Sequence, residues 1–142
     1  TASGSAAPAG PVREVTPPPV TTILLADDEE AVLSFCRRML MRDGHRVLEA
    51  RDGVEAVESV RAHPGEIDLI LLDMTMPRMG GREAYEAIRA LDPAVKVVLS
   101  SGFSESETVA RFGHAGLAGF LHKPYSAQDL RAMVRDVLSK GA

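Results

Sequence analysis

The sequence has a single cysteine, no long apolar run and no excess of positive charge. Cys36 has no partner for an internal disulfide, which fits a reducing compartment. No apolar run approaches the roughly 18 residues of a membrane span, and no basic start leads into an apolar core, so we expect a cytoplasmic domain, free or tethered to a larger protein. A net charge of -4 and a pI near 5.5 argue against a nucleic-acid surface.

The rest of the composition is that of an ordinary globular protein of one domain. The 142 residues are 45% hydrophobic and 25% charged. Residues 1–22 differ, because they hold five of the nine prolines. Such a segment buries too little apolar surface to offset its ordering entropy. We therefore predict a disordered linker or tail over residues 1–22 and one folded domain over residues 23–140.

The predicted domain alternates short apolar runs with helical patterns. The runs predict five strands, at 23–26, 45–49, 67–72, 95–99 and 119–122. Amphipathic segments follow them, such as 82–91 after the third run. This alternation predicts an α/β fold with a doubly wound, five-stranded parallel sheet and helices on both faces.

Polar side chains follow four of the predicted strands. Asp27 and Asp28 follow the first strand, and Asp73 follows the third. Ser100 follows the fourth strand and Lys123 follows the fifth. The carboxyl ends of parallel strands meet at one edge of the sheet, so we expect these side chains to converge on one crevice.

Three adjacent carboxylates repel one another, and a divalent cation relieves that repulsion. Oxygen ligands suit Mg²⁺, with Mn²⁺ as the alternative ion. We predict Asp28 and Asp73 as direct ligands together with the Thr75 backbone carbonyl. Asp27 is predicted to act through a bound water. The ion and Lys123 would form a positive pocket beside Asp73, which suits a transferring phosphoryl group.

In this interpretation Asp73 is the phosphoacceptor. Its phosphoryl oxygens are predicted to contact the Ser100 hydroxyl and the Lys123 ammonium. The backbone N–H groups of Ser101 and Thr75 would serve the remaining oxygens.

Four motifs together resemble the receiver domain of two-component response regulators. They are Asp27-Asp28, Asp73 with Pro77 four residues later, Ser100-Ser101-Gly102, and Lys123-Pro124. The resemblance covers about residues 22–140. It implies the flavodoxin-like strand order 2-1-3-4-5, Mg²⁺ dependence, phosphoryl transfer from a phosphohistidine, and slow self-catalysed dephosphorylation without other enzymatic activity.

The resemblance also implies a conformational switch. Ser100 would move toward the phosphate, and an aromatic residue would follow it inward, altering the surface of the fourth helix, fifth strand and last helix. Phe120 stands at the aromatic position without the hydroxyl of the frequent tyrosine, and plain core packing is its alternative role. The bond before Pro124 is a candidate cis peptide.

The implied partner is a histidine kinase or a histidine phosphotransfer protein. The domain itself is expected to be a monomer or weak dimer and to make no direct contact with nucleic acid or membrane. The run 99–105 is similar to the corresponding stretch of bacterial receivers at the end of hybrid sensor kinases. We therefore expect the domain to come from a hybrid sensor kinase. One alternative is an aspartyl-nucleophile phosphatase on a related fold, but those enzymes generally have a second aspartate where this chain has Thr75. The other alternative is an interaction module that works without phosphorylation.

Overall fold

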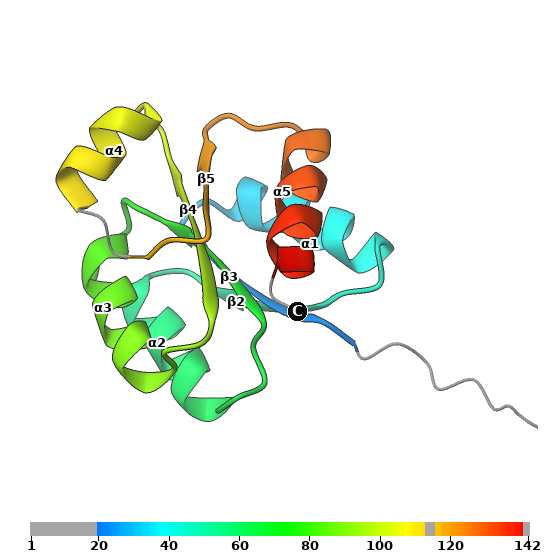
Figure 1. Ribbon diagram of the computed structural model, residues 1–142, viewed down its shortest axis with the longest axis horizontal. Helices are drawn as coiled ribbons and strands as arrows, with labels where there is room; N and C mark the ends of the chain where they lie inside the picture. Colours follow the sequence, from blue (N-terminus) through cyan, green and yellow to red (C-terminus); the bar gives the residue numbers. More distant parts are fainter. Residues whose placement is uncertain (1–19, 113–115, 141–142) are drawn as a thin grey trace, which may run out of the picture.

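The computed structural model describes residues 20–112 and 116–140, in which five strands alternate with five helices (Figure 1). Among these residues no helix combines the length and apolarity needed to cross a bilayer. The elements in chain order are β1 (Thr22–Ala26), α1 (Glu30–Arg42), β2 (Arg46–Ala50), α2 (Gly53–Ala62), β3 (Leu69–Asp73), α3 (Gly81–Leu91), β4 (Lys96–Ser101), α4 (Glu105–Phe112), β5 (Gly119–His122) and α5 (Ala127–Lys140).

The strands form one parallel sheet in the order β2-β1-β3-β4-β5. This confirms the predicted fold class and strand order. The central strand β3 is buried along its whole length and pairs with β1 on one side and β4 on the other. The sheet therefore brings the ends of β1, β3 and β4 side by side.

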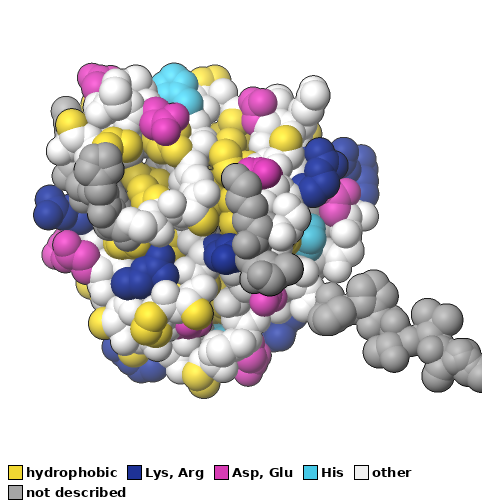
Figure 2. All heavy atoms as spheres, viewed as in Figure 1, with side chains coloured by type: hydrophobic (Ala, Val, Ile, Leu, Met, Phe, Trp, Pro, Cys, Tyr) yellow, Lys and Arg dark blue, Asp and Glu magenta, His cyan; other side chains and the backbone are white. Residues whose placement is uncertain are grey.

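Two hydrophobic cores lie on opposite faces of the sheet. Successive strand residues point to opposite faces, so an uninterrupted apolar strand fills both. Ile70 packs with α2 and α3, whereas its neighbours Leu69 and Leu71 pack with α1 and α5. Figure 1 shows α1 and α5 on one side of the sheet and α2 and α3 on the other. On the molecular face in Figure 2, acidic and basic side chains are interspersed.

Several predicted strand limits differ from the observed ones by one or two residues: β2, for example, was predicted at 45–49 and β3 was predicted to start at residue 67. Asp73 is the last residue of β3 and not the first residue after it, because it pairs with Ser100 in the sheet. β4 extends to Ser101, which pairs with β5. Thr22, assigned to the predicted linker, begins β1 and pairs with Arg46. Residues 1–19 of that linker lie outside the described residues.

Local sequence signals set several helix ends. Ser104 and Glu107 each accept a hydrogen bond from the other's backbone N–H, both at 3.2 Å, at the start of α4. Ser126 and Asp129 do the same before α5, at 3.0 and 3.1 Å. Gly44 follows α1 with φ +90, a conformation that favours glycine. The caps of α4 and α5 set where the loops after β4 and β5, at the carboxyl edge of the sheet, end.

Candidate functional site

The structure brings the three predicted carboxylates together at the carboxyl edge of the sheet. Asp27 follows β1 directly and Asp73 ends β3, while Asp28 continues the first loop. Asp27, Asp28 and Asp73 each offer an oxygen within 4.8 Å of the other two. Asp27 and Asp73 are buried, at 4% and 5% exposure, and Asp28 is exposed. One side of the cluster thus opens to solvent.

Lys123 joins this cluster from the end of β5. Its Nζ lies 2.8 Å from Asp27 Oδ2 and 3.4 Å from Asp73 Oδ1. The Lys123 backbone N–H donates to the Ser101 carbonyl at 2.8 Å, and this hydrogen bond fixes the backbone from which the side chain extends. The predicted convergence of the strand ends therefore describes the geometry correctly, while the chemical role of each residue stays a prediction.

A further carboxylate reaches Lys123 that the sequence did not single out as a site residue. Glu29 Oε1 lies 3.2 Å from the ammonium, and its side chain is 62% exposed. Its one sequence signal is its position directly after Asp27-Asp28, where acids also suit the start of a helix. Glu29 gives the ammonium a partner on the solvent side of the cluster.

Burial and charge shift the protonation of Asp73. Burial, followed by the negative charge of Asp27, raises the pKa of Asp73 to about 7. The Lys123 ammonium and the Thr75 N–H oppose that rise. For Lys123, burial alone would lower the pKa, but the hydrogen bond to Asp27 and the charge of Asp73 outweigh it, so the pKa is raised. The amine stays charged beside a carboxylate that is poised to take or lose a proton near neutral pH.

The residues present fit a hard divalent cation. The carboxylates offer oxygen donors only, and their three charges exceed the single charge of Lys123. Both oxygens of Asp27 are already engaged, Oδ1 by the Glu29 N–H at 2.9 Å and Oδ2 by Lys123. This favours contact of Asp27 with an ion through water, and leaves Asp28 and Asp73 for direct contact.

The predicted phosphate-contacting residues other than Lys123 lie at the end of β4 and in the loop after β3. Ser100 is buried and pairs with Asp73 across β3 and β4. The hydroxyl of buried Ser101 accepts the Phe103 N–H at 3.0 Å. Thr75 is exposed in the loop after β3.

The structure places the two remaining predicted residues on β5 and just after it. Phe120 pairs with Leu99 and is half-buried against the core shared by α2 and α3. This contact accounts for Phe120 as a packing residue, while its switching role stays a prediction. The bond between Lys123 and Pro124 is cis.

Cys36 is buried in α1 and contacts a side chain distant in sequence. Its Sγ lies 3.3 Å from the hydroxyl of Tyr125. Burial raises the pKa of the thiol and also that of the Tyr125 hydroxyl, so both stay protonated. The contact ties the loop that follows Lys123 to α1.

The family model of the response regulator receiver domain matches residues 23–135. The chain belongs to this family. As a receiver domain it is a module of two-component signalling, a class whose members are generally not enzymes.

Relatives of this receiver domain include both kinases and free-standing receivers. It is 35% identical to the sensor kinase CckA of Brucella abortus over 114 residues, which are 80% of this chain and 12% of the kinase. It is 29% identical to the chemotaxis protein CheY of Halobacterium salinarum over 113 residues, 80% of this chain and 92% of CheY. The solved receiver domain of the hybrid histidine kinase CckA superimposes with a TM-score of 0.71 at 32% identity, covering 82% of this chain and 98% of that one.

Many relatives are longer than this chain. It spans between 12% and 55% of the length of seven curated relatives that it matches. Their activities as whole proteins therefore belong to segments beyond the receiver domain as well.

Proposed function

We propose that this receiver domain is the phosphoacceptor of a two-component phosphorelay and that Asp73 takes the phosphoryl group from a phosphohistidine. One observation carries the proposal: the Lys123 ammonium lies 3.4 Å from the buried Asp73 carboxylate, beside the carboxylates of Asp27 and Asp28. A carboxylate flanked by an ammonium and a cation-binding pair is equipped to carry a second negative group.

The transfer forms one bond and breaks one. An Asp73 oxygen bonds to phosphorus, the bond from phosphorus to the histidine nitrogen breaks, and its electron pair stays on the imidazole. Lys123 neutralises charge on the transferring group, and the burial of Asp73 limits access of water to the reacting oxygen. Phosphoryl transfer needs mainly such positioning and charge stabilisation.

Asp28, Asp73 and the Thr75 carbonyl would hold Mg²⁺, or Mn²⁺ in its place. Asp27 would contact the ion through water, because both of its oxygens already accept hydrogen bonds. The bound ion supplies positive charge for the phosphoryl oxygens.

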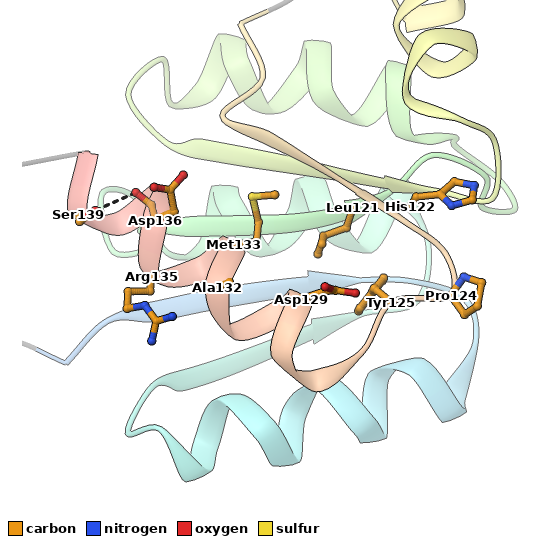
Figure 3. A pocket seen from close by; sticks show the side chains of 10 residues that line it. All are labelled: Leu121, His122, Pro124, Tyr125, Asp129, Ala132, Met133, Arg135, Asp136 and Ser139. Atoms are coloured by element: carbon orange, nitrogen blue, oxygen red, sulfur yellow. Dashed lines mark hydrogen bonds between the residues drawn. The ribbon is translucent and has the colours of Figure 1, made fainter.

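The remaining phosphoryl oxygens would be met by the Ser100 hydroxyl and by the backbone N–H groups of Ser101 and Thr75. We propose that Ser100 moves toward the phosphate and Phe120 follows it, changing the surface formed by α4, β5 and α5. Figure 3 shows the β5–α5 part of this surface, a groove lined by Leu121 of β5 and by Met133, Asp129 and Asp136 of α5.

The partner in this proposal is a histidine kinase or a histidine phosphotransfer protein. The similarity to the CckA receiver supports a bacterial hybrid sensor kinase as the parent protein. The domain would then work at the cytoplasmic side of its sensor, as a monomer or weak dimer.

The test is phosphorylation by a small donor. With acetyl phosphate and Mg²⁺, the wild-type domain should gain one phosphoryl group by intact-mass spectrometry, and Asp73→Asn or added chelator should abolish the gain. A wild-type domain that binds Mg²⁺ but gains no phosphate would refute the phosphoacceptor proposal. Sustained turnover of a phosphate ester would instead support a phosphatase.

A further inference from the structure

The loop between β3 and α3 contains an uncommon backbone conformation close to the site. Among residues 20–112 and 116–140, Arg78 is the one non-glycine residue with positive φ, at 64. It stands at the centre of a three-residue turn closed by a 2.6 Å hydrogen bond from the Met79 N–H to the Pro77 carbonyl. The positive-φ form of this turn is rare and strained. Such conformations persist where the surroundings impose them, often at functional sites.

An ion pair with the start of α2 holds Arg78 in place. Arg78 Nε donates to Asp52 Oδ2 at 2.7 Å. The Asp52 side chain is only 9% exposed, and its other oxygen caps α2 by accepting the Glu55 N–H at 2.8 Å. The partner of Arg78 is therefore itself fixed by a helix end.

A backbone contact fastens the same turn a second time. The Gly53 N–H donates to the Met79 carbonyl at 3.0 Å. A Cβ at position 53 would overlap that carbonyl oxygen and lie 2.8 Å from Met79 Cβ. The start of α2 and the turn thus touch so closely that position 53 admits no side chain without displacing the loop.

The other end of the loop is fixed beside the site. The Met74 N–H donates to the Ser100 carbonyl at 2.9 Å, and the Gly81 N–H donates to the Met74 carbonyl at 2.9 Å. Thr75, the residue after Met74, therefore lies between this anchor and the anchor at Arg78 and Met79. A shift at the second anchor would therefore be passed along the backbone to Thr75.

We propose that Arg78 is a positioning residue of this site: its ion pair with Asp52 holds the β3–α3 loop so that the Thr75 backbone stays in place beside Asp73. The inference rests on the proposed function, in which the Thr75 carbonyl is a ligand of Mg²⁺. Residues that orient metal ligands from outside the coordination sphere change metal affinity by about 10- to 100-fold when removed. Arg78 would act in this way through the backbone of the loop.

Arg78→Gly separates this role from a purely structural one. Glycine removes the ion pair but adopts positive φ without penalty, so we expect the variant to fold. Mg²⁺ affinity, measured by calorimetry, should fall about tenfold. Gly53→Ala, which disturbs the backbone hydrogen bond between Gly53 and Met79, should also weaken Mg²⁺ binding. Arg131→Ala is the matched control, because it removes a comparable Arg–Asp pair between α5 and Asp43 and should leave the affinity unchanged.

Backbone amide shifts provide a readout independent of activity. In Arg78→Gly, we expect the NMR signals of Thr75 and Met79 to move and hydrogen exchange at Met79 to speed up. Unchanged Mg²⁺ affinity in both Arg78→Gly and Gly53→Ala, with the wild type binding normally, would overturn the positioning role even if stability fell. Failure of the wild type itself to bind Mg²⁺ would instead refute the proposed function.

Discussion

At pH 8 without divalent metal, Asp73→Asn is expected to be more stable than the wild-type domain. Burial and the charge of Asp27 raise the pKa of Asp73 from its ordinary 3.8 to about 7, so ionising this carboxyl in the folded chain is unfavourable. The difference corresponds to at most about 4 kcal/mol at 1.36 kcal/mol per unit. That upper bound already includes the opposing attraction to Lys123, and we expect a net gain of about 2 kcal/mol, or roughly 5–10 °C in Tm.

The effect has a defined pH window. Because the pKa of Asp73 is higher in the folded than in the unfolded chain, the folded chain binds more protons between pH 3.8 and about 7. The Asp73 contribution to stability is present in full below that window and is lost as the pH rises through about 7. Urea unfolding of the wild type and Asp73→Asn from pH 5 to 8 should show the two free energies diverging.

Saturating Mg²⁺ should make the wild type the more stable of the two proteins, because its Asp73 carboxylate binds the ion and asparagine binds it poorly. Glu86→Gln changes an exposed acid on α3 and should leave stability within about 0.5 kcal/mol at every pH. An Asp73→Asn variant less stable than the wild type in chelator at pH 8 would contradict the raised pKa of Asp73.

Lys123→Ala is expected to separate phosphorylation from metal binding. Removing a group that stabilises charge in the transition state lowers rates by about 100- to 1,000-fold. The initial rate of phosphorylation by acetyl phosphate should fall by that order. Mg²⁺ affinity should not fall, because the ammonium now 2.8 Å from Asp27 and 3.4 Å from Asp73 competes with any bound cation.

Lys96→Ala is the matched control for this experiment. Lys96 begins β4, at the edge of the sheet opposite the site, and its loss should leave both the phosphorylation rate and Mg²⁺ affinity unchanged. A Lys123→Ala domain phosphorylated at the wild-type rate would show that the ammonium has no part in the transfer.

The fold and the convergence of site residues were predictable because both follow from short-range patterns. Short apolar runs that alternate with helical patterns predict a parallel sheet, and parallel strands bring Asp27, Asp73 and Lys123 to one edge. The strand limits were less accurate, because pairing partners decide them: β4 extends to Ser101 because β5 lies beside it.

Each missed contact joins a loop residue to a side chain far away in the sequence or in another element. Glu29 reaches Lys123 across 94 residues of sequence, and Cys36 reaches Tyr125 across 89. The ion pair between Arg78 and Asp52 is made by a residue with positive φ, a conformation that arginine rarely adopts. No local pattern encodes such contacts, so only the assembled fold reveals them.

The most direct measurement locates the phosphoryl group on the chain. After reaction with acetyl phosphate and Mg²⁺, borohydride reduction converts an aspartyl phosphate to homoserine, which peptide mass spectrometry can assign to one position. We predict homoserine at position 73 alone, and none when a chelator is present. Reduction at any other carboxylate, or stable phosphate on a hydroxyl side chain with Asp73 unmodified, would contradict the phosphoacceptor role of Asp73.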